Sequence, residues 1–386
     1  MQFSLMYFSS TQSEHKEDNY QLLIEGATFA DRNDFTAIWT PERHFHAFGG
    51  LYPNPSVLSS ALAMITRHIR LRAGSVVLPL HNIVRVVEEW AIVDNLSRGR
   101  VDLAFARGWN PDDFVLAPQN FAPFTSNTDA LFSGITTVQK LWQGETISVP
   151  NGMGMDTPIR VYPSPYQRKL PIWITCSGDA DRFREAGAYG ANVLTALIFQ
   201  SLADLEQKIA LYRHARAEHG HDPATGHVTL MLHTFIGEDL DLVRETVRGP
   251  FTEYLKTSVD LWRHSATKLD KLSATEQEDL LAYAFERYFQ TSALLGTSDT
   301  CLQMVKDLQV IGVNEIACLI DFGVETETVL QSLDGLNTLR KLANGVQSTQ
   351  PSNSQDDLPA KLDQLSDEQM RALLNRLQEK EEAKNE

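Results

Sequence analysis

Residues 70–110, RLRAGSVVLPLHNIVRVVEEWAIVDNLSRGRVDLAFARGWN, contain the pattern that decides the fold. Two runs rich in apolar and β-branched residues, Arg70–Leu78 and Val101–Ala106, are separated by a helical pattern over Val84–Ser97. Two such runs joined through one helix predict a β–α–β unit, in which the strands are parallel and covered on both faces. The same alternation continues in both directions along the chain.

This alternation recurs often enough to predict an α/β fold of the (β/α)8 TIM-barrel type. The predicted strands are Phe3–Phe8, Phe35–Thr40, Arg70–Leu78, Val101–Ala106, Pro171–Thr175, Asn192–Ala196, Val228–Ile236 and Glu315–Ile320. Helical patterns occupy Tyr20–Asn33, Pro55–Arg67, Val84–Ser97, Asp181–Tyr189, Leu202–Glu218, Asp239–Arg263, Thr275–Gln290 and Thr326–Leu342. Eight strands that each return through a helix predict a barrel. A doubly wound sheet would show the same alternation, so the barrel depends on the strand count.

Two segments interrupt the rhythm. Residues 107–170, between the fourth and fifth strands, are too many for an ordinary connection and include a helical pattern over Asp129–Trp142. We expect this insertion at the C-terminal face of the barrel, as a substrate lid. Residues 346–386 are free of aromatic residues, and we expect a polar linker and a short amphipathic helix, separate from a barrel domain of residues 1–345. That helix is either a solvated chain end or a docking element.

Charge and composition exclude several classes of protein. Thirty-four basic against 50 acidic residues give a formal net charge of −16, which argues against nucleic acid as a partner. No apolar run approaches the ~18–20 residues of a membrane span. The cysteines Cys176, Cys301 and Cys318 are widely spaced, as in proteins of the reducing cytoplasm. The P-loop, the Rossmann glycine motif after the first strand, GxSxG and HExxH are all absent from the sequence.

A loop directly after the second predicted strand carries titratable side chains. The segment PERHFH, residues 41–46, contains Glu42, Arg43, His44 and His46. At the mouth of a barrel these residue types suit acid–base chemistry, whereas an ion pair of Glu42 with Arg43 is the simpler structural explanation. A metal site would need further ligands nearby, so no metal is predicted.

Two other segments are suited to bind an anion. FARGWN, residues 105–110, ends the fourth strand and places Arg107 beside Gly108, which lets a ligand approach the backbone closely. TCSGD, residues 175–179, joins the fifth strand to a helix, so its backbone N–H groups lie at a helix N-terminus. Each segment alone is equally an ordinary turn. Together they predict a phosphate site between the fourth and fifth strands.

Several longer motifs resemble the bacterial luciferase-like FMN-dependent monooxygenase family, in its natural-product biosynthesis branch. They are WTPERHFHAFGG, AGSVVLPLHN, EEWAIVDNLSRGRVDLAFARGWNPDDF, ERYFQTSALLGT and GVNEIACLIDFG, and the resemblance runs from residue 1 to about residue 342. It implies a TIM-barrel enzyme that uses reduced FMN and O2, by way of a flavin C4a-(hydro)peroxide. It further implies that an intermediate of polyketide or non-ribosomal peptide biosynthesis is oxygenated while bound to a carrier protein.

The resemblance also implies roles for individual residues. The residues matching the family's FMN contacts, or its cis peptide under the flavin ring, are Arg107, Gly108, Ser75, Val76, Ser177, Gly178 and Asp179. Where luciferases have adjacent histidines, this chain has Arg43 and His44. Arginine does not release its proton at ordinary pH. The hypothesis is therefore that His44 is the acid–base residue, that Arg43 orients substrate or peroxide, and that His46 is a second proton donor.

Three other functions stay open at this point. A flavin or deazaflavin reductase would use the same barrel for hydride transfer, and a non-catalytic flavin-binding partner protein would use it for binding alone. A glycosidase would need paired carboxylates, for which Asp321 and Glu42 are the candidates. Because no nicotinamide motif is visible, we expect a separate flavin reductase as a partner. The family resemblance implies a homodimer formed through Pro55–Arg67 and Val84–Ser97.

Overall fold

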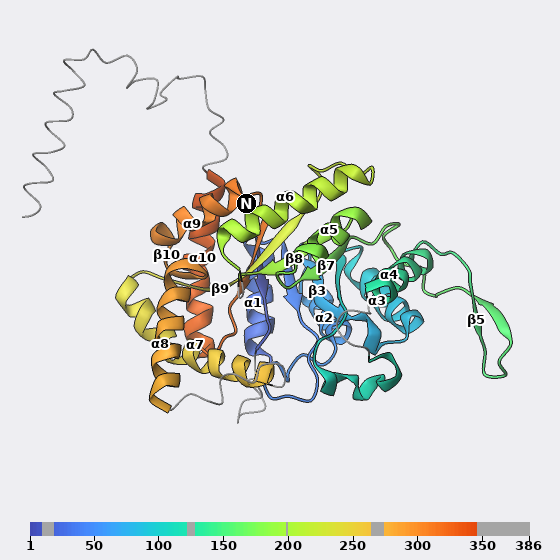
Figure 1. Ribbon diagram of the computed structural model, residues 1–386, viewed down its shortest axis with the longest axis horizontal. Helices are drawn as coiled ribbons and strands as arrows, with labels where there is room; N and C mark the ends of the chain where they lie inside the picture. The colour runs from blue at the N-terminus through green and yellow to red at the C-terminus, as the bar shows by residue number, and fades with distance from the viewer. Residues whose placement is uncertain (10–18, 122–127, 198–199, 264–273, 346–386) are drawn as a thin grey trace, which may run out of the picture. The chain divides into compact units, whose positions relative to one another are not determined.

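A closed ring of parallel strands forms the centre of the computed structural model, which describes residues 1–9, 19–121, 128–197, 200–263 and 274–345. Within those ranges eight strands pair in the order β1-β2-β3-β4-β7-β8-β9-β11, and β11 pairs with β1 to close the ring. Figure 1 shows the chain path. These strands are β1 Gln2–Met6, β2 Ala37–Thr40, β3 Arg70–Val77, β4 Val101–Ala106, β7 Ile172–Cys176, β8 Asn192–Ala196, β9 Val228–Gly237 and β11 Glu315–Leu319.

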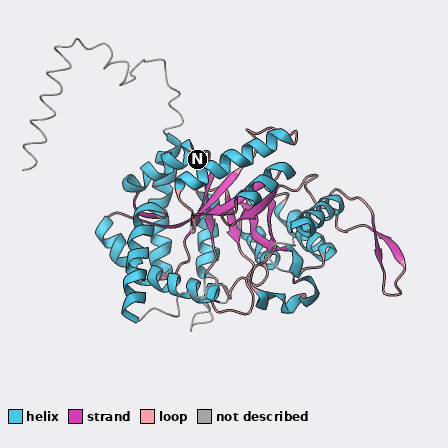
Figure 2. Ribbon diagram, viewed as in Figure 1, coloured by secondary structure: helices cyan, strands magenta, loops and turns pink. Residues whose placement is uncertain are grey.

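Helices follow most of these strands and surround them, as the cyan and magenta ribbons of Figure 2 show. Asn54 and Asn82 accept hydrogen bonds from the first turns of the helices that follow them, which fixes where two of these helices begin. The helices are α1 Gln21–Arg32, α2 Pro55–Ile65, α3 Ile83–Ser97, α4 Thr128–Trp142, α5 Ala180–Tyr189, α6 Leu202–Glu218, α7 Leu240–Arg263, α8 Ala274–Thr291, α9 Ser298–Val310 and α10 Thr326–Gly345.

The predicted barrel is confirmed, and each of the eight predicted strands overlaps one strand of the ring. Sequence analysis missed the strand β10 (Leu294–Thr297), which pairs only with the carboxyl-terminal part of β9. It also missed the antiparallel hairpin of β5 (Ile147–Pro150) and β6 (Asp156–Ile159). In Figure 1 this hairpin extends away from the strands of the ring.

The predicted insertion is present, but the expectation that all of it forms a substrate lid is wrong. Its first part stays at the carboxyl ends of the strands, where the Asn120 amide donates to the Pro79 carbonyl oxygen at 2.8 Å. Helix α4 then carries the chain back to the other end. There the Gln167 side-chain amide donates to the carbonyl oxygen of Val101, the first residue of β4, at 2.8 Å. Because α4 leads to the amino-terminal end, residues 143–170 are not part of a lid over the carboxyl-terminal face.

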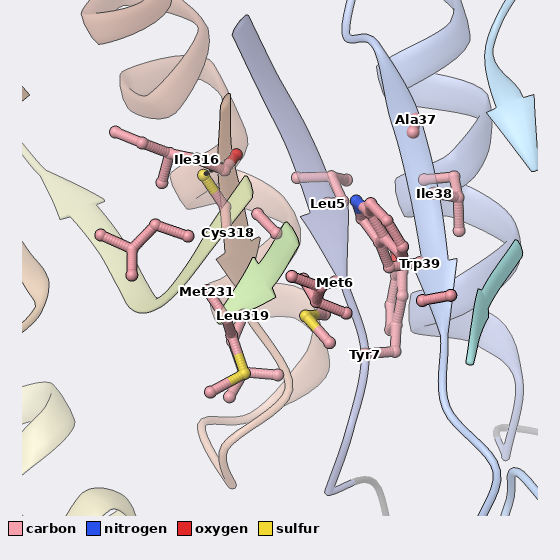
Figure 3. Packing of buried hydrophobic residues seen from close by; sticks show 14 of the residues in the cluster. Leu5, Met6, Tyr7, Ala37, Ile38, Trp39, Met231, Ile316, Cys318 and Leu319 are labelled. Carbon is pink, nitrogen blue, oxygen red and sulfur yellow. Dashed lines mark hydrogen bonds between the residues drawn. The ribbon is translucent and has the colours of Figure 1, made fainter. Parts of the chain in front are cut away.

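Apolar residues fill the ring, but its amino-terminal end also encloses a group of charges. Leu5, Met6, Trp39 and Met231 pack together among the strands in Figure 3. At the amino-terminal end the buried Arg72 guanidinium donates to Glu315 at 2.7 and 2.8 Å and to Asp102 at 2.7 Å. The guanidinium also lies 4.8 Å from the ring centroid of Trp39.

The chain divides by its contacts into a unit of Met1–Ala343 and a second unit of Asn344–Glu386. The linker and amphipathic helix predicted for residues 346–386 lie outside the described residues, so they stay predictions. In the described ranges, no helix is both long and apolar enough to cross a membrane.

Candidate functional site

The residues singled out from the sequence follow four neighbouring strands of the ring. The loop of Glu42 and Arg43 follows β2, Ser75 and Val76 lie near the end of β3, Arg107 follows β4, and the turn of Ser177 follows β7. These strands are parallel and adjacent in the order β2-β3-β4-β7. All four groups therefore lie at the carboxyl-terminal face, where barrel enzymes carry out their chemistry.

Glu42 is fully buried and binds two histidines. Its Oε1 lies 3.0 Å from His44 Nε2 and 2.5 Å from His81 Nε2, and its Oε2 accepts the Val77 N–H at 2.7 Å. Burial alone would raise the pKa of Glu42, but the hydrogen bonds of both histidines outweigh it, so the pKa is lowered. The simpler explanation of a Glu42–Arg43 ion pair is therefore wrong, because Glu42 bonds to the imidazoles instead.

Arg43 lies among aromatic rings. Its guanidinium carbon is 5.1 Å from the ring centroid of Phe8, 5.6 Å from that of Phe48 and 5.7 Å from that of Trp109. Burial lowers the pKa of Arg43, and the charge of Asp113 opposes this shift. The arrangement is a buried cation held by π faces, which suits an anionic or polarised ligand group.

His46 lies apart from the Glu42 group. It is exposed, and its Nδ1 accepts a hydrogen bond from the Phe48 N–H at 3.1 Å. This contact explains His46 as a residue that shapes the loop. The geometry gives no support to its expected role as a second proton donor.

The carboxylate Asp321, the partner of Glu42 in the glycosidase hypothesis, also binds backbone. Its carboxylate accepts the Phe8 N–H at 2.9 Å and the Ser9 N–H at 3.0 Å. Both candidate carboxylates thus hold backbone N–H groups of the barrel. The glycosidase hypothesis is correspondingly weakened, because neither carboxylate is left as an acid or nucleophile with its own coordination open.

The end of β3 has an unusual backbone. The Gly74–Ser75 peptide bond is cis, at the position where the family resemblance placed it. A Cβ on Gly74 would lie 3.0 Å from the Trp39 ring, so any larger residue here would press against that ring. Ser75 and Val76 are buried, and the Ser75 hydroxyl is hydrogen-bonded to the Thr175 hydroxyl on β7.

Arg107 and Gly108 lie beyond the end of β4. Burial lowers the pKa of Arg107, the nearby positive charge of Arg182 lowers it further, and Asp179 opposes the shift. Gly108 has a φ of +75°, and a Cβ there would come within 2.8 Å of Val77. Strands β4 and β7 pair in parallel, with Phe105 opposite Ile174, so the two predicted anion-binding segments that follow them lie side by side.

The turn between β7 and α5 presents its backbone to solvent. Gly178 has a φ of +100°, and only the Lys208 Nζ, at 3.9 Å, approaches the place where a Cβ would lie. Ser177 is exposed. The Asp179 carboxylate accepts the Asp181 N–H at 3.0 Å and caps α5. The Asp179 side chain would therefore repel an anion, so only its backbone could contribute to binding one.

These residues fit the phosphate of FMN. The turn has an open place at Gly178 that a side chain would fill, with the Lys208 ammonium beside it and Arg107 at the end of the neighbouring strand β4. Arg182 is also nearby but is paired with Glu185 at 2.8 Å. The Gly74–Ser75 bond and Val76 lie on strand β3, next to β4, where a ring system attached to that phosphate would extend. The site thus has a phosphate-binding part and a buried apolar part on neighbouring strands.

Sequence analysis missed three residues of this face, namely His81, Asp113 and Lys208. His81 ends the quoted motif AGSVVLPLHN together with Asn82, so a histidine just beyond a barrel strand was the available signal. Asp113 is buried on η2 (Pro111–Leu116), and burial raises its pKa. Lys208 is on α6, far from any motif in sequence.

Comparison with known proteins places the chain among luciferase-like monooxygenases, whose family model matches residues 1–315. Among curated proteins, the oxygenase component of a flavin-dependent trigonelline monooxygenase from Acinetobacter baylyi is 24% identical over 344 residues. That alignment covers 86% of this chain and 93% of the relative.

Solved structures show the same fold. The monooxygenase RslO1 from Streptomyces bottropensis has a TM-score of 0.72 at 21% identity, covering 88% of this chain and 98% of its own. The oxygenating constituent of 3,6-diketocamphane monooxygenase from Pseudomonas putida, a type II Baeyer–Villiger monooxygenase in complex with FMN, has a TM-score of 0.69 at 18% identity. It covers 87% of this chain and 96% of its own.

Proposed function

The chain belongs to the luciferase-like monooxygenase family, as a flavin-dependent monooxygenase, and we propose that it uses reduced FMN and O2 to oxygenate a carrier-bound intermediate of polyketide or non-ribosomal peptide biosynthesis. The observation that carries the proposal is that Arg107 and the Ser177–Asp179 turn follow the paired strands β4 and β7, beside the end of β3 with its cis Gly74–Ser75 bond. Oxygenation is favoured over reduction because the matching family is one of monooxygenases.

The residues of the carboxyl-terminal face divide the work in this proposal. Arg107, Gly108 and the backbone of Ser177–Asp179 hold the phosphate, while Ser75 and Val76 support the flavin ring. Bound reduced FMN supplies the electrons that activate O2. His44 donates or accepts a proton at an imidazole nitrogen, and Arg43 orients the substrate.

A cleft near Arg43 with a mixed lining supports a substrate that has both apolar and polar parts. The cavity of about 350 Å³ borders apolar side chains such as Phe48, Leu51 and Phe322, and polar ones such as Asn19 and Glu253. Phe48 is one of the rings around the Arg43 guanidinium, so the cleft adjoins the proposed site. The apolar part of this lining can bury the hydrocarbon portion of an acyl group.

Intact-protein mass spectrometry tests the reaction and the substrate together. The full chain is incubated with chemically reduced FMN, O2 and a panel of acylated carrier proteins, and free acyl thioesters of the same groups serve as the comparison. We expect a carrier to gain the mass of one oxygen atom. Equal conversion of free and carrier-bound substrate would remove the carrier from the proposal, and no oxygenated product from either would contradict the proposal itself.

The source of reduced flavin belongs to the same proposal. The relative from Acinetobacter baylyi is the oxygenase component of its system. We propose that this chain likewise receives reduced FMN from a separate reductase. A cytoplasmic location is also proposed, since Cys176, Cys301 and Cys318 are buried free thiols, as a reducing compartment allows.

The proposed homodimer has support on α2 and α3. Val57, Met64 and Ile65 on α2, with Ile92 and Leu96 on α3, are exposed apolar residues, and the two helices are in contact. Such a patch is typical of a surface that binds another protein. Sedimentation equilibrium should give twice the chain mass, with Met64→Glu shifting it toward the monomer. A monomeric wild-type chain would contradict the dimer.

A further inference from the structure

A single buried carboxylate joins histidines from two different loops. His44 follows β2 and His81 follows η1 (Leu78–Leu80), yet both Nε2 atoms lie within hydrogen-bond distance of Glu42 Oε1, at 3.0 and 2.5 Å. We name these three residues the Glu42 bridge. The second carboxylate oxygen accepts the Val77 N–H at 2.7 Å, which fixes the orientation of the carboxylate.

Exposure differs sharply along the Glu42 bridge. The side chain of Glu42 has 0% of its surface exposed, that of His44 10% and that of His81 30%. Among the described residues, both imidazoles touch Glu42 Oε1, so each is a route by which a proton can reach or leave Glu42. His81 is the more open to solvent, and His44 is the one in the proposed catalytic loop.

The acidic side chains around the Glu42 bridge favour the protonated form of His81. His81 faces Glu42 and Glu89 of α3, while His44 faces Glu42 and Asp113 of η2. Asp113 in turn lies in the field of Arg43. Burial opposes a charge on His81, but the hydrogen bond and charge of Glu42 outweigh it, so the pKa of His81 is raised.

We propose that His81 is a positioning residue that exchanges protons between solvent and His44 through Glu42. The role of His44 rests on the proposed function. In one passage His44 takes up a proton at Nδ1 and gives its Nε2 proton to Glu42 Oε1. Glu42 passes that proton to His81 Nε2, and His81 releases its Nδ1 proton to water. One proton enters and one leaves, the carboxylate is regenerated, and each imidazole ends as its other tautomer.

Replacing His81 with glutamine separates this role from a structural one. The amide of a glutamine can still donate a hydrogen bond to Glu42, but it cannot carry a proton between two partners. If His81 only held Glu42 in place, glutamine would replace it with little effect on the turnover rate. If His81 exchanges protons, glutamine will lower that rate.

Nuclear magnetic resonance of the flavin-free full chain tests the coupling without any turnover. The imidazole signals of His81 are followed against pH in wild type, Glu42→Gln and His44→Gln, with His214→Gln as control. His214 is an exposed histidine paired with Glu218 on α6. We expect Glu42→Gln to lower the titration midpoint of His81 by about one unit or more. We expect His44→Gln to move that midpoint because the two imidazoles share one carboxylate.

The control variant should leave the His81 midpoint where it is in wild type. A His81 midpoint that is the same in wild type, Glu42→Gln and His44→Gln would overturn the proposal. This outcome is independent of the reaction, because neither flavin nor substrate is present.

Turnover with reduced FMN, O2 and substrate supplies the second readout. His81→Gln should lower the turnover rate on the order of 100-fold. Its pH–rate profile should also lack the inflection that the titration of His81 produces in wild type. His81→Ala should regain rate when free imidazole is added, since the side chain it replaces is partly exposed. Wild-type rates in both variants without imidazole would overturn the proposal. Absence of turnover in wild type would instead contradict the proposed function, and the magnetic-resonance result would still decide the coupling.

Discussion

The two ends of the barrel both bury charged side chains, and they satisfy them differently. At the amino-terminal end Arg72 is bonded to Glu315 and Asp102 and stacked against Trp39. At the carboxyl-terminal end Arg43 has aromatic rings around it, and its neighbour in sequence, Glu42, is bonded to histidines. A charged side chain whose hydrogen-bonding groups are all used, such as Arg72, stabilises the fold. A buried cation held by aromatic rings, such as Arg43, can still donate hydrogen bonds to a ligand.

The same contrast extends to protonation. Burial opposes ionisation of Glu315, but Arg72 and His227 outweigh it and hold the pKa of Glu315 below its ordinary value. The Glu315 side chain has no exposed surface, and its partner His227 lies at the amino-terminal end of the barrel, just before β9. Glu42 also has a lowered pKa, but it leads through His81 to solvent. The comparison therefore predicts stability effects at one end and functional effects at the other.

The largest effect is expected from Arg72→Met. Among the described residues, removing this guanidinium leaves the buried Glu315 with only His227 and Asp102 with only Arg70 as basic partners. Breaking a buried ion pair in this way typically costs about 3–5 kcal/mol of unfolding free energy. Urea unfolding followed by circular dichroism measures it. Arg248→Met is the control, because Arg248 makes a surface ion pair with Glu286 and such pairs contribute about 0–1 kcal/mol. A loss below about 1 kcal/mol in Arg72→Met would show that the charges at this end are dispensable.

A smaller effect, dependent on pH, is expected from Glu42→Gln. Loss of charged hydrogen bonds to His44, His81 and the Val77 N–H should cost about 1.5–3 kcal/mol at pH 7. Because the folded-state pKa of Glu42 is lowered, its contribution is present above the ordinary value of about 4.5 and is lost as the pH falls through the folded pKa.

The raised pKa of His81 acts in the opposite direction. Its contribution is complete below about pH 6.5 and is lost as the pH rises through the folded pKa. Unfolding free energies measured between pH 4 and 8 should therefore vary less in Glu42→Gln than in wild type. If the unfolding free energies of the two proteins changed with pH in parallel, Glu42 would not contribute its hydrogen bonds to His44 and His81. Glu218→Gln, in the exposed pair with His214, should change stability by less than about 1 kcal/mol.

The sequence was sufficient for the barrel because its strands and helices alternate with a regular period. It was insufficient for β10 because four residues with an internal glycine give no clear period. Residues 143–170 lie at the amino-terminal end because α4 runs back to that end of the barrel. The direction in which a helix runs relative to the barrel cannot be predicted from the local sequence pattern. A lid was therefore expected where none of that segment lies.

Site residues on one loop could be predicted, whereas contacts between loops could not. Arg43, His44 and Arg107 directly follow strands, so the barrel alone places them at the catalytic face. The bond of His81 to Glu42 joins residues 39 positions apart. Arg72, Asp102 and Glu315 lie within apolar runs, and only the closed ring brings their charges together.

The central claim is that the carboxyl-terminal face binds reduced FMN through Arg107. Calorimetric titration of reduced FMN under argon tests it most directly, in wild type, Arg107→Ala and the surface control Arg248→Ala. We predict that Arg107→Ala weakens binding by about 10- to 100-fold, since a charged hydrogen bond to phosphate is lost, while the control binds as wild type does. Equal dissociation constants in all three proteins would contradict the claim.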